Sequence, residues 1–195
     1  MNQRTEAILN EMETVIVGKR EVLKKTLMAI LSRGHILLDD VPGVGKTTLA
    51  LACSRTLGLD YQRIQFTPDV IPSDIVGFSV YNRDQGSFDY KPGAVMTNLL
   101  LADEINRTSS KTQSALLEVM EEGQVTVDGI THALPAPFVV IATQNPAGSA
   151  GTQLLPQAQL DRFMICVSMG YPSVKEEVEI MKRNQSGRST GPVRR

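Results

Sequence analysis

The sequence predicts an α/β fold, a three-layer sandwich in which helices cover both faces of a mainly parallel five-stranded sheet, with two β-hairpins inserted. Short apolar runs alternate along the chain with stretches whose apolar residues recur at helical spacing. A glycine-rich loop at 40–48 also lies directly between a predicted strand and a predicted helix. The chain has 195 residues, which is enough for one such domain with a sizeable core.

The helices are predicted from apolar residues spaced three and four positions apart. They are expected at about 8–16, 22–31, 46–57, 110–122 and from 174 onward, with a short turn at 72–74 and a short helix at 156–163. Gly34 is suited to end the second of these helices. Capping boxes, in which the side chains of two residues three apart satisfy the first turn, are expected at Ser110 with Gln113 and at Ser173 with Glu176.

The strands are predicted from apolar runs that are too short for helices. The parallel strands are expected at 35–39, 61–66, 99–102, 138–142 and 164–169. Two further pairs of short runs predict antiparallel hairpins, at 78–90 and at 124–134. The second is the stronger prediction, because Asp128 and Gly129 form the residue pair that a type I′ turn favours.

Composition excludes several classes of protein. The net charge is −1 and the sequence pI is about 6.1, so no basic surface for nucleic acid is indicated. No apolar run is long enough to cross a bilayer, and Glu6, Glu11 and Glu13 argue against a signal peptide. Cys53 and Cys166 form no CxxC pair and are expected to be reduced, buried thiols. The default expectation is a cytoplasmic protein without a membrane segment.

The loop that follows the first predicted strand has the sequence pattern of a phosphate-binding loop, which lies between a strand and a helix. It comprises Asp40, Val41, Pro42, Gly43, Val44, Gly45, Lys46, Thr47 and Thr48. Gly43 and Gly45 allow backbone N–H groups to turn inward around a polyphosphate. Lys46 is expected on the β- and γ-phosphates, and the Thr47 hydroxyl on Mg²⁺.

This loop departs from the full pattern, G-x-x-x-x-G-K-S/T, at one position. Asp40 stands where the first glycine belongs, and a negative charge near a phosphate is mildly unfavourable. The alternative interpretation is an ordinary glycine-rich turn between a strand and a helix.

Polar residues follow three later elements in the same half of the fold. Asp103 and Glu104 end a buried strand, where one carboxylate can hold Mg²⁺ and the second can polarise an attacking water. Asn145 ends the next strand and can fix a γ-phosphate or the water. Arg162 lies near the end of a short helix and can stabilise phosphoryl-transfer charge. Taken singly, these residues also fit a polar strand end, a turn, and a surface arginine paired with an acid such as Asp161.

Together these motifs resemble the MoxR-type AAA+ ATPases, over about 15–184. The resemblance implies that Lys46 and Thr47 are the Walker A residues and that Asp103 and Glu104 are the Walker B pair. It implies that Asn145 is sensor 1 and that Arg162 is an arginine finger reaching a neighbour's nucleotide. Val17 and Gly18 fall where the adenine pocket of the family begins, and the hairpins match the helix-2 insert and the pre-sensor-1 hairpin of that clade.

The resemblance has two further departures. Gln157 stands where a glutamate is usual, which bears on contacts between subunits. The helical lid of the family, with its sensor-2 arginine, does not follow within the sequence, so 1–184 is expected to be the ATPase core and 185–195 a linker towards such a lid.

The function expected from these features is Mg²⁺-dependent ATP hydrolysis that drives remodelling or maturation of partner proteins. The family implies a homo-oligomeric ring, expected to be a hexamer, and a client with a von Willebrand factor A domain. The alternative is a scaffold that assembles with nucleotide and hydrolyses little. A small-molecule kinase fits less well, because no acceptor-site residues stand out and a glutamate base suits water, and the neutral charge argues against a DNA-remodelling role.

Overall fold

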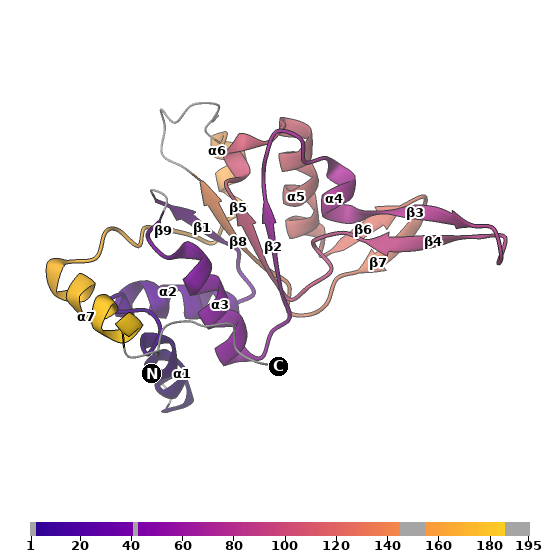
Figure 1. Cartoon of the computed structure of the whole chain (residues 1–195). Helices are drawn as coiled ribbons and strands as arrows, with labels where there is room; N and C mark the ends of the chain where they lie inside the picture. Colours follow the sequence, from indigo (N-terminus) through magenta and orange to yellow (C-terminus); the bar gives the residue numbers. More distant parts are fainter. Residues whose placement is uncertain (1–2, 41–42, 145–154, 186–195) are drawn as a thin grey trace.

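Five parallel strands form the central sheet of the structure, a computed structural model that describes residues 3–40, 43–144 and 155–185. Their spatial order is β2-β5-β8-β1-β9, which confirms the predicted parallel sheet (Figure 1). The strands are β1 (Ile36–Asp39), β2 (Tyr61–Gln65), β5 (Leu99–Asp103), β8 (Val139–Gln144) and β9 (Ile165–Val167).

Helices lie on both faces of this sheet, as Figure 1 shows. The helical elements of the described residues are α1 (Gln3–Glu13), α2 (Arg20–Leu31), α3 (Lys46–Leu57), α4 (Pro72–Val76), α5 (Ser110–Glu122), α6 (Gln157–Leu160), α7 (Val174–Gln185) and the 3₁₀ turn η1 (Ile105–Arg107). Of these, α7 extends away from the sheet, at the lower left of Figure 1. The first helix was expected to reach residue 16 but ends at Glu13, although Ile16 beyond it is still buried. Helix α7 runs to Gln185, the first residue of the expected linker, and 186–195 lie outside the described residues.

Strand residues divide between two hydrophobic cores because successive side chains point to opposite faces. Leu99 and Leu101 of β5 belong to the core that packs against α1, α2 and α3. Leu100 and Ala102 of the same strand belong to the core under α4 and α5. Continuous apolar runs such as 99–102 were therefore correctly interpreted as strands that are covered on both faces.

Two local predictions are corrected. The residue in the left-handed region after helix α2 and its C-cap Ser32 is Arg33 (φ 57°), not Gly34. Gly34 is needed for space, since a Cβ there would lie 2.4 Å from the Met164 sulfur. Helix α5 is capped by Ser109, whose side chain accepts a hydrogen bond from the Thr112 backbone N–H, so the capping box predicted from Ser110 is wrong.

Both cysteines are free thiols, as predicted, but they differ in burial. Cys53 lies in the core, where burial raises its pKa to about 12. Cys166 is exposed, which corrects the prediction that both are buried. The reason is its position on β9, the edge strand of the sheet.

The two antiparallel hairpins project from the same side of the sheet (Figure 1). They are β3 (Gly77–Asn82) with β4 (Ser87–Pro92), and β6 (Gln124–Val127) with β7 (Ile130–Ala133). Positive φ angles at Asp128 and Gly129 confirm the predicted type I′ turn. The rings of Tyr90 and His132 stack at 3.9 Å between centroids, so the two hairpins contact each other.

Candidate active site

A row of polar side chains lies where β2, β5 and β8 end. Residues 99 and 101 of β5 face α3, and alternation places Asp103 on that same face. Gln65 is the register partner of Asp103 on β2. The Thr143 hydroxyl of β8 donates a hydrogen bond to the Asp103 carboxylate. The carboxyl edge of the sheet therefore presents acid, amide and hydroxyl groups towards the helix that follows the glycine-rich loop.

The described part of the glycine-rich loop has the backbone shape that phosphate binding requires. Gly43 and Gly45 have φ of 88° and 94°, in the region that glycine adopts without strain. A Cβ on Gly43 would meet no atom within 4 Å, so this glycine is required for its dihedral angle, not for space. Gly45 is the N-cap of α3, so the helix begins at Lys46. Val41 and Pro42 lie outside the described residues.

Lys46 is buried at the start of α3, with 8% of its surface exposed. Its ammonium group donates a hydrogen bond to the carbonyl oxygen of Asp40 at 2.5 Å. Burial lowers the pKa of Lys46, while the carboxylates of Asp40, Asp103, Glu104 and Asp39 act in the opposite direction. The ammonium thus lies in the field of the acids that end β1 and β5, which is where a polyphosphate with a metal ion would need it.

Asp103 is held by one residue on each side. Its Oδ1 accepts a hydrogen bond from the Thr143 hydroxyl at 2.6 Å, and its Oδ2 pairs with Arg63 of β2 at 2.6 Å. A hydroxyl and a guanidinium both stabilise the charged carboxylate. These two contacts therefore hold the carboxylate in a fixed orientation.

Glu104 has an unusual backbone for a non-glycine residue, with φ 58° and ψ 47°. The left-handed region costs about 1–2 kcal/mol for such a residue. The Glu104 N–H donates to the Thr143 hydroxyl oxygen at 2.8 Å, so one threonine contacts both acids. The Oε2 atom accepts from Gln65 at 2.9 Å and from Arg107 at 2.8 Å.

Asp40 does not direct its carboxylate to the phosphate side of the loop. The carboxylate accepts hydrogen bonds from the Ser168 hydroxyl at 2.6 Å, from the Met169 N–H, and from the Gly170 N–H at 3.1 Å. These residues follow β9, the neighbour of β1 in the sheet. The expected electrostatic penalty at this position is therefore compensated by three donors.

Val17 and Gly18 lie beside the same part of the chain. Gly18 has φ 73°, and a Cβ there would overlap the Glu176 carboxylate. The neighbouring Lys19 donates from its ammonium to the Tyr171 carbonyl oxygen at 3.1 Å. The α1–α2 connection, the glycine-rich loop and the residues after β9 are thus linked by direct contacts.

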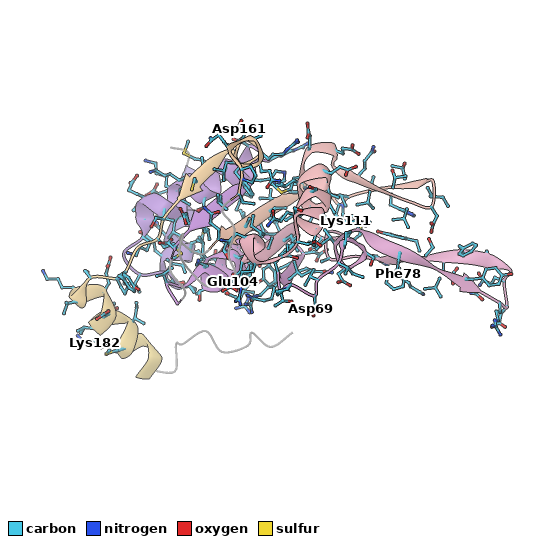
Figure 2. The ribbon with its side chains drawn as sticks, turned by 90° about the horizontal axis from the view of Figure 1, so that it is seen from above. Asp69, Phe78, Glu104, Lys111, Asp161 and Lys182 are labelled. Carbon is cyan, nitrogen blue, oxygen red and sulfur yellow. The ribbon has the colours of Figure 1, made fainter. Side chains whose placement is uncertain are left out.

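Arg162 is found at the opposite edge of the sheet. It precedes β9 and forms an ion pair with Glu121, near the carboxyl end of α5. Two residues on, the Met164 N–H donates to the carbonyl of His35, which precedes β1. Lys46 follows the other end of β1, a strand of four residues, or about 13 Å. Figure 2 shows Asp161, beside this arginine, and Glu104 on opposite sides of the molecule.

The structure thus brings together Lys46, Asp103 and Glu104 and separates Arg162 from them. Asn145 lies outside the described residues. Sequence reasoning missed Arg63, Gln65, Thr143 and Arg107, which bind the two acids. A polar residue directly after the expected buried strand was the available signal for Thr143, and Arg107 lies only three residues from Glu104. Arg63 and Gln65, in contrast, meet the acids only through the pairing of β2 with β5.

The donor set fits a hard cation such as Mg²⁺. The Asp103 carboxylate and the Thr47 hydroxyl could supply two oxygen ligands, and Mg²⁺ commonly takes the rest of its shell from water and phosphate. Consistently, no group of three or more His, Cys, Asp or Glu side chains that would form a protein-only metal cage occurs in the described residues. Within those same residues, none of the helices has the length and apolarity to span a bilayer.

A parallel sheet with a glycine-rich loop after its inner strand β1 and an acid pair after β5 defines the class of P-loop nucleoside triphosphatases. Residues 35–165 match the family described as "ATPase family associated with various cellular activities (AAA)". The chain therefore belongs to the AAA family of ATPases, and within it to the MoxR group.

The relatives agree with this assignment. The chain is 58% identical over 167 residues to the uncharacterized protein YeaC of Bacillus subtilis, covering 86% of this chain and 52% of the relative. It is 47% identical over 178 residues to Chaperone MoxR1 of Mycobacterium tuberculosis, covering 91% and 47%. A crystal structure from Cytophaga hutchinsonii, assigned as an ATPase, superposes with a TM-score of 0.83 at 44% identity, covering 93% and 55%. The chain spans about half the length of the curated relatives it matches.

Proposed function

We propose that this chain is the core of an ATPase that binds Mg-ATP and hydrolyses it with water. The observation that carries the proposal is the close grouping of the buried Lys46 ammonium with the carboxylates of Asp103 and Glu104 at one edge of the sheet. Residues 1–184 would form the core, with 185–195 leading to a lid.

In this proposal the residues divide the reaction among them. Lys46 leaves the Asp40 carbonyl and binds the β- and γ-phosphates. Asp103 and Thr47 would hold a Mg²⁺ ion, which would supply positive charge to neutralise the phosphates. Glu104 accepts the proton of the attacking water. Asn145 would orient that water, and Val17 with Gly18 would border the adenine.

Arg162 is proposed to act on the nucleotide of a second copy. Its position at the amino edge of the sheet, beside Glu121, supports this role because the acids of its own chain lie at the carboxyl edge. A closed ring, expected to be a hexamer, supplies each site with a neighbour's arginine. By analogy with the MoxR relatives, the energy would drive remodelling of a client protein, for which a von Willebrand factor A domain is the expected class.

A matched pair of variants tests the proposal. Glu104→Gln keeps the shape of the side chain but removes its basicity, so it should bind ATP with near wild-type affinity and lose hydrolysis by at least about 100-fold. Lys46→Ala should lose ATP binding itself. Equilibrium binding and phosphate release are measured for both. Unchanged turnover in the first variant, or unchanged affinity in the second, contradicts the assigned roles.

A second candidate function is a scaffold that assembles with nucleotide but hydrolyses little. One observation favours it: the Glu104 carboxylate is already bound by Gln65 and Arg107, which leaves it poorly placed to accept a proton from water. Sedimentation with and without ATP, beside a phosphate-release assay, separates the two. Assembly driven by ATP without phosphate release favours the scaffold.

A further inference from the structure

Asp40 is a buried acid whose three hydrogen-bond donors all belong to one short segment, residues 168–171, which we call the post-β9 segment. Asp40 is 6% exposed, and its carboxylate binds the hydroxyl of Ser168 and the backbone N–H groups of Met169 and Gly170. These partners lie 128 to 130 positions further along the chain. A buried carboxylate that satisfies two backbone donors fixes the path of that backbone.

The post-β9 segment connects the sheet to α7 and lies against the α1–α2 connection. Tyr171, its last residue, accepts a hydrogen bond from Lys19. Helix α7 begins three residues later, and its Glu176 contacts Gly18. Any shift of the post-β9 segment is therefore transmitted to α7 and to the residues proposed to border the adenine.

The second polar group of Asp40 faces the nucleotide side of the loop. Its carbonyl oxygen accepts the hydrogen bond of the Lys46 ammonium at 2.5 Å. A polyphosphate in the loop would draw this ammonium onto its own oxygens. The reason is that a hydrogen bond between two charged groups is stronger than one to a neutral carbonyl. The carbonyl oxygen of Asp40 then loses its hydrogen bond from the Lys46 ammonium. The carboxylate of the same residue still binds the post-β9 segment.

We propose that Asp40 is a positioning residue that couples occupancy of the phosphate loop to the position of the post-β9 segment and of α7. This inference rests on the proposed function, since it takes ATP as the ligand of the loop. It explains why an acid occupies the place of the first glycine of the loop pattern: a glycine there would bind phosphate but would not hold the segment.

The first experiment needs no nucleotide. Amide hydrogen exchange at Met169 and Gly170 is measured in the wild type, in Asp40→Asn and in Asp39→Asn. Asp40→Asn removes the charged acceptor, so exchange at these two amides should accelerate by at least about tenfold. Asp39→Asn is the matched control, because it removes the same charge one residue away on an exposed side chain. Equal exchange in the wild type and Asp40→Asn overturns the proposal.

The second experiment adds saturating Mg-ATP. In the wild type, exchange at Met169 and Gly170 should change on ATP binding, and Asp39→Asn should respond in the same way. Asp40→Gly restores the consensus loop, so it should bind ATP yet lose this response; if it does not fold, Asp40→Asn takes its place. A response that survives in the variant overturns the coupling. A wild type that binds ATP without any response overturns the coupling alone, whereas a wild type that binds no ATP overturns the proposed function as well.

Discussion

The two edges of the central sheet where its parallel strands begin and end differ in the kind of side chain they carry and in what those side chains bind. At the carboxyl edge, Lys46, Asp103 and Glu104 are ionisable side chains, and the two acids bind the side chains of other polar residues. At the amino edge, His35 is buried between β8 and α5, and both of its described hydrogen bonds are to backbone. Its Nδ1 accepts from the Val140 N–H and its Nε2–H donates to the Met120 carbonyl, both at 3.0 Å. The carboxyl edge thus presents ionisable groups, whereas the contacts at the amino edge fix the strands against the helix.

Arg162 differs from the other residues described at the amino edge. It lies at the amino edge but is charged and partly exposed, and its partner Glu121 is a surface acid. A surface ion pair contributes little to stability, about 0–1 kcal/mol. The arginine can therefore leave its partner at small cost, which is what a residue that acts on another subunit requires.

The largest effect is expected for Arg162→Ala. If the arginine serves a neighbouring site, hydrolysis should fall by about 10³-fold while ATP binding stays near wild type. Steady-state phosphate release and equilibrium ATP binding check this. Glu121→Gln is the matched control, since it breaks the same ion pair but keeps the arginine, and it should retain activity.

A mixing experiment separates action within one chain from action between chains. Arg162→Ala keeps its own loop, and Lys46→Ala keeps its arginine, so a mixture should hydrolyse ATP although neither variant does so alone. Inactive mixtures that still assemble into rings would show that the arginine does not act between subunits.

An intermediate effect is expected for Thr143→Val at the carboxyl edge. The hydroxyl binds Asp103 and the strained backbone of Glu104, so its loss should lower the rate of hydrolysis by about 10- to 100-fold and change ATP affinity little. Thr143→Ser restores the hydroxyl and should recover most of the rate. A rate unaffected by valine would mean that the two acids need no such support.

The smallest effect concerns the stability of the amino edge. Burial lowers the pKa of His35 below 6.5, and the bond to Met120 opposes this shift. Between the lowered pKa and 6.5 the unfolded chain binds more protons than the folded chain. The free energy of unfolding should therefore fall as the pH drops below 6.5, by at most about 1.4 kcal/mol per pH unit.

Denaturant unfolding at several pH values measures this dependence. His35→Gln should be less stable than the wild type at neutral pH. Its free energy of unfolding should not show the fall below pH 6.5 that His35 causes in the wild type. His132→Gln is the control, because the second histidine of the chain lies on a hairpin. A wild-type curve that is flat between pH 5 and 6.5 would contradict the prediction.

Local sequence signals predicted most of the elements and the position of the glycine-rich loop. The apolar run before Asp103 identified β5, and the glycine spacing identified the loop and the start of α3 at Lys46. These predictions succeeded because the determining residues are neighbours in the sequence. The functional roles of all the site residues stay predictions, and Asn145, Val41 and Pro42 also lie outside the described residues.

What could not be predicted depends on contacts between distant residues. The Asp40 carboxylate looked unfavourable beside a phosphate, because its partners lie about 130 positions away in sequence. Arg63 meets Asp103 only through the pairing of β2 with β5. Gly34 was predicted to end a helix, whereas the structure requires glycine there because a Cβ would overlap the side chain of Met164.

The strand order has a consequence for how this protein is made. Strand β1 pairs with β8 and β9, whose residues lie more than 100 positions later, and with neither β2 nor β5. During synthesis the ribosome therefore releases the glycine-rich loop long before the strands that flank its base exist. Parallel pairings of such long range form slowly and leave strand edges exposed in the meantime. The segment of the chain that becomes the phosphate cradle is therefore translated well before the two strands that complete the sheet around β1.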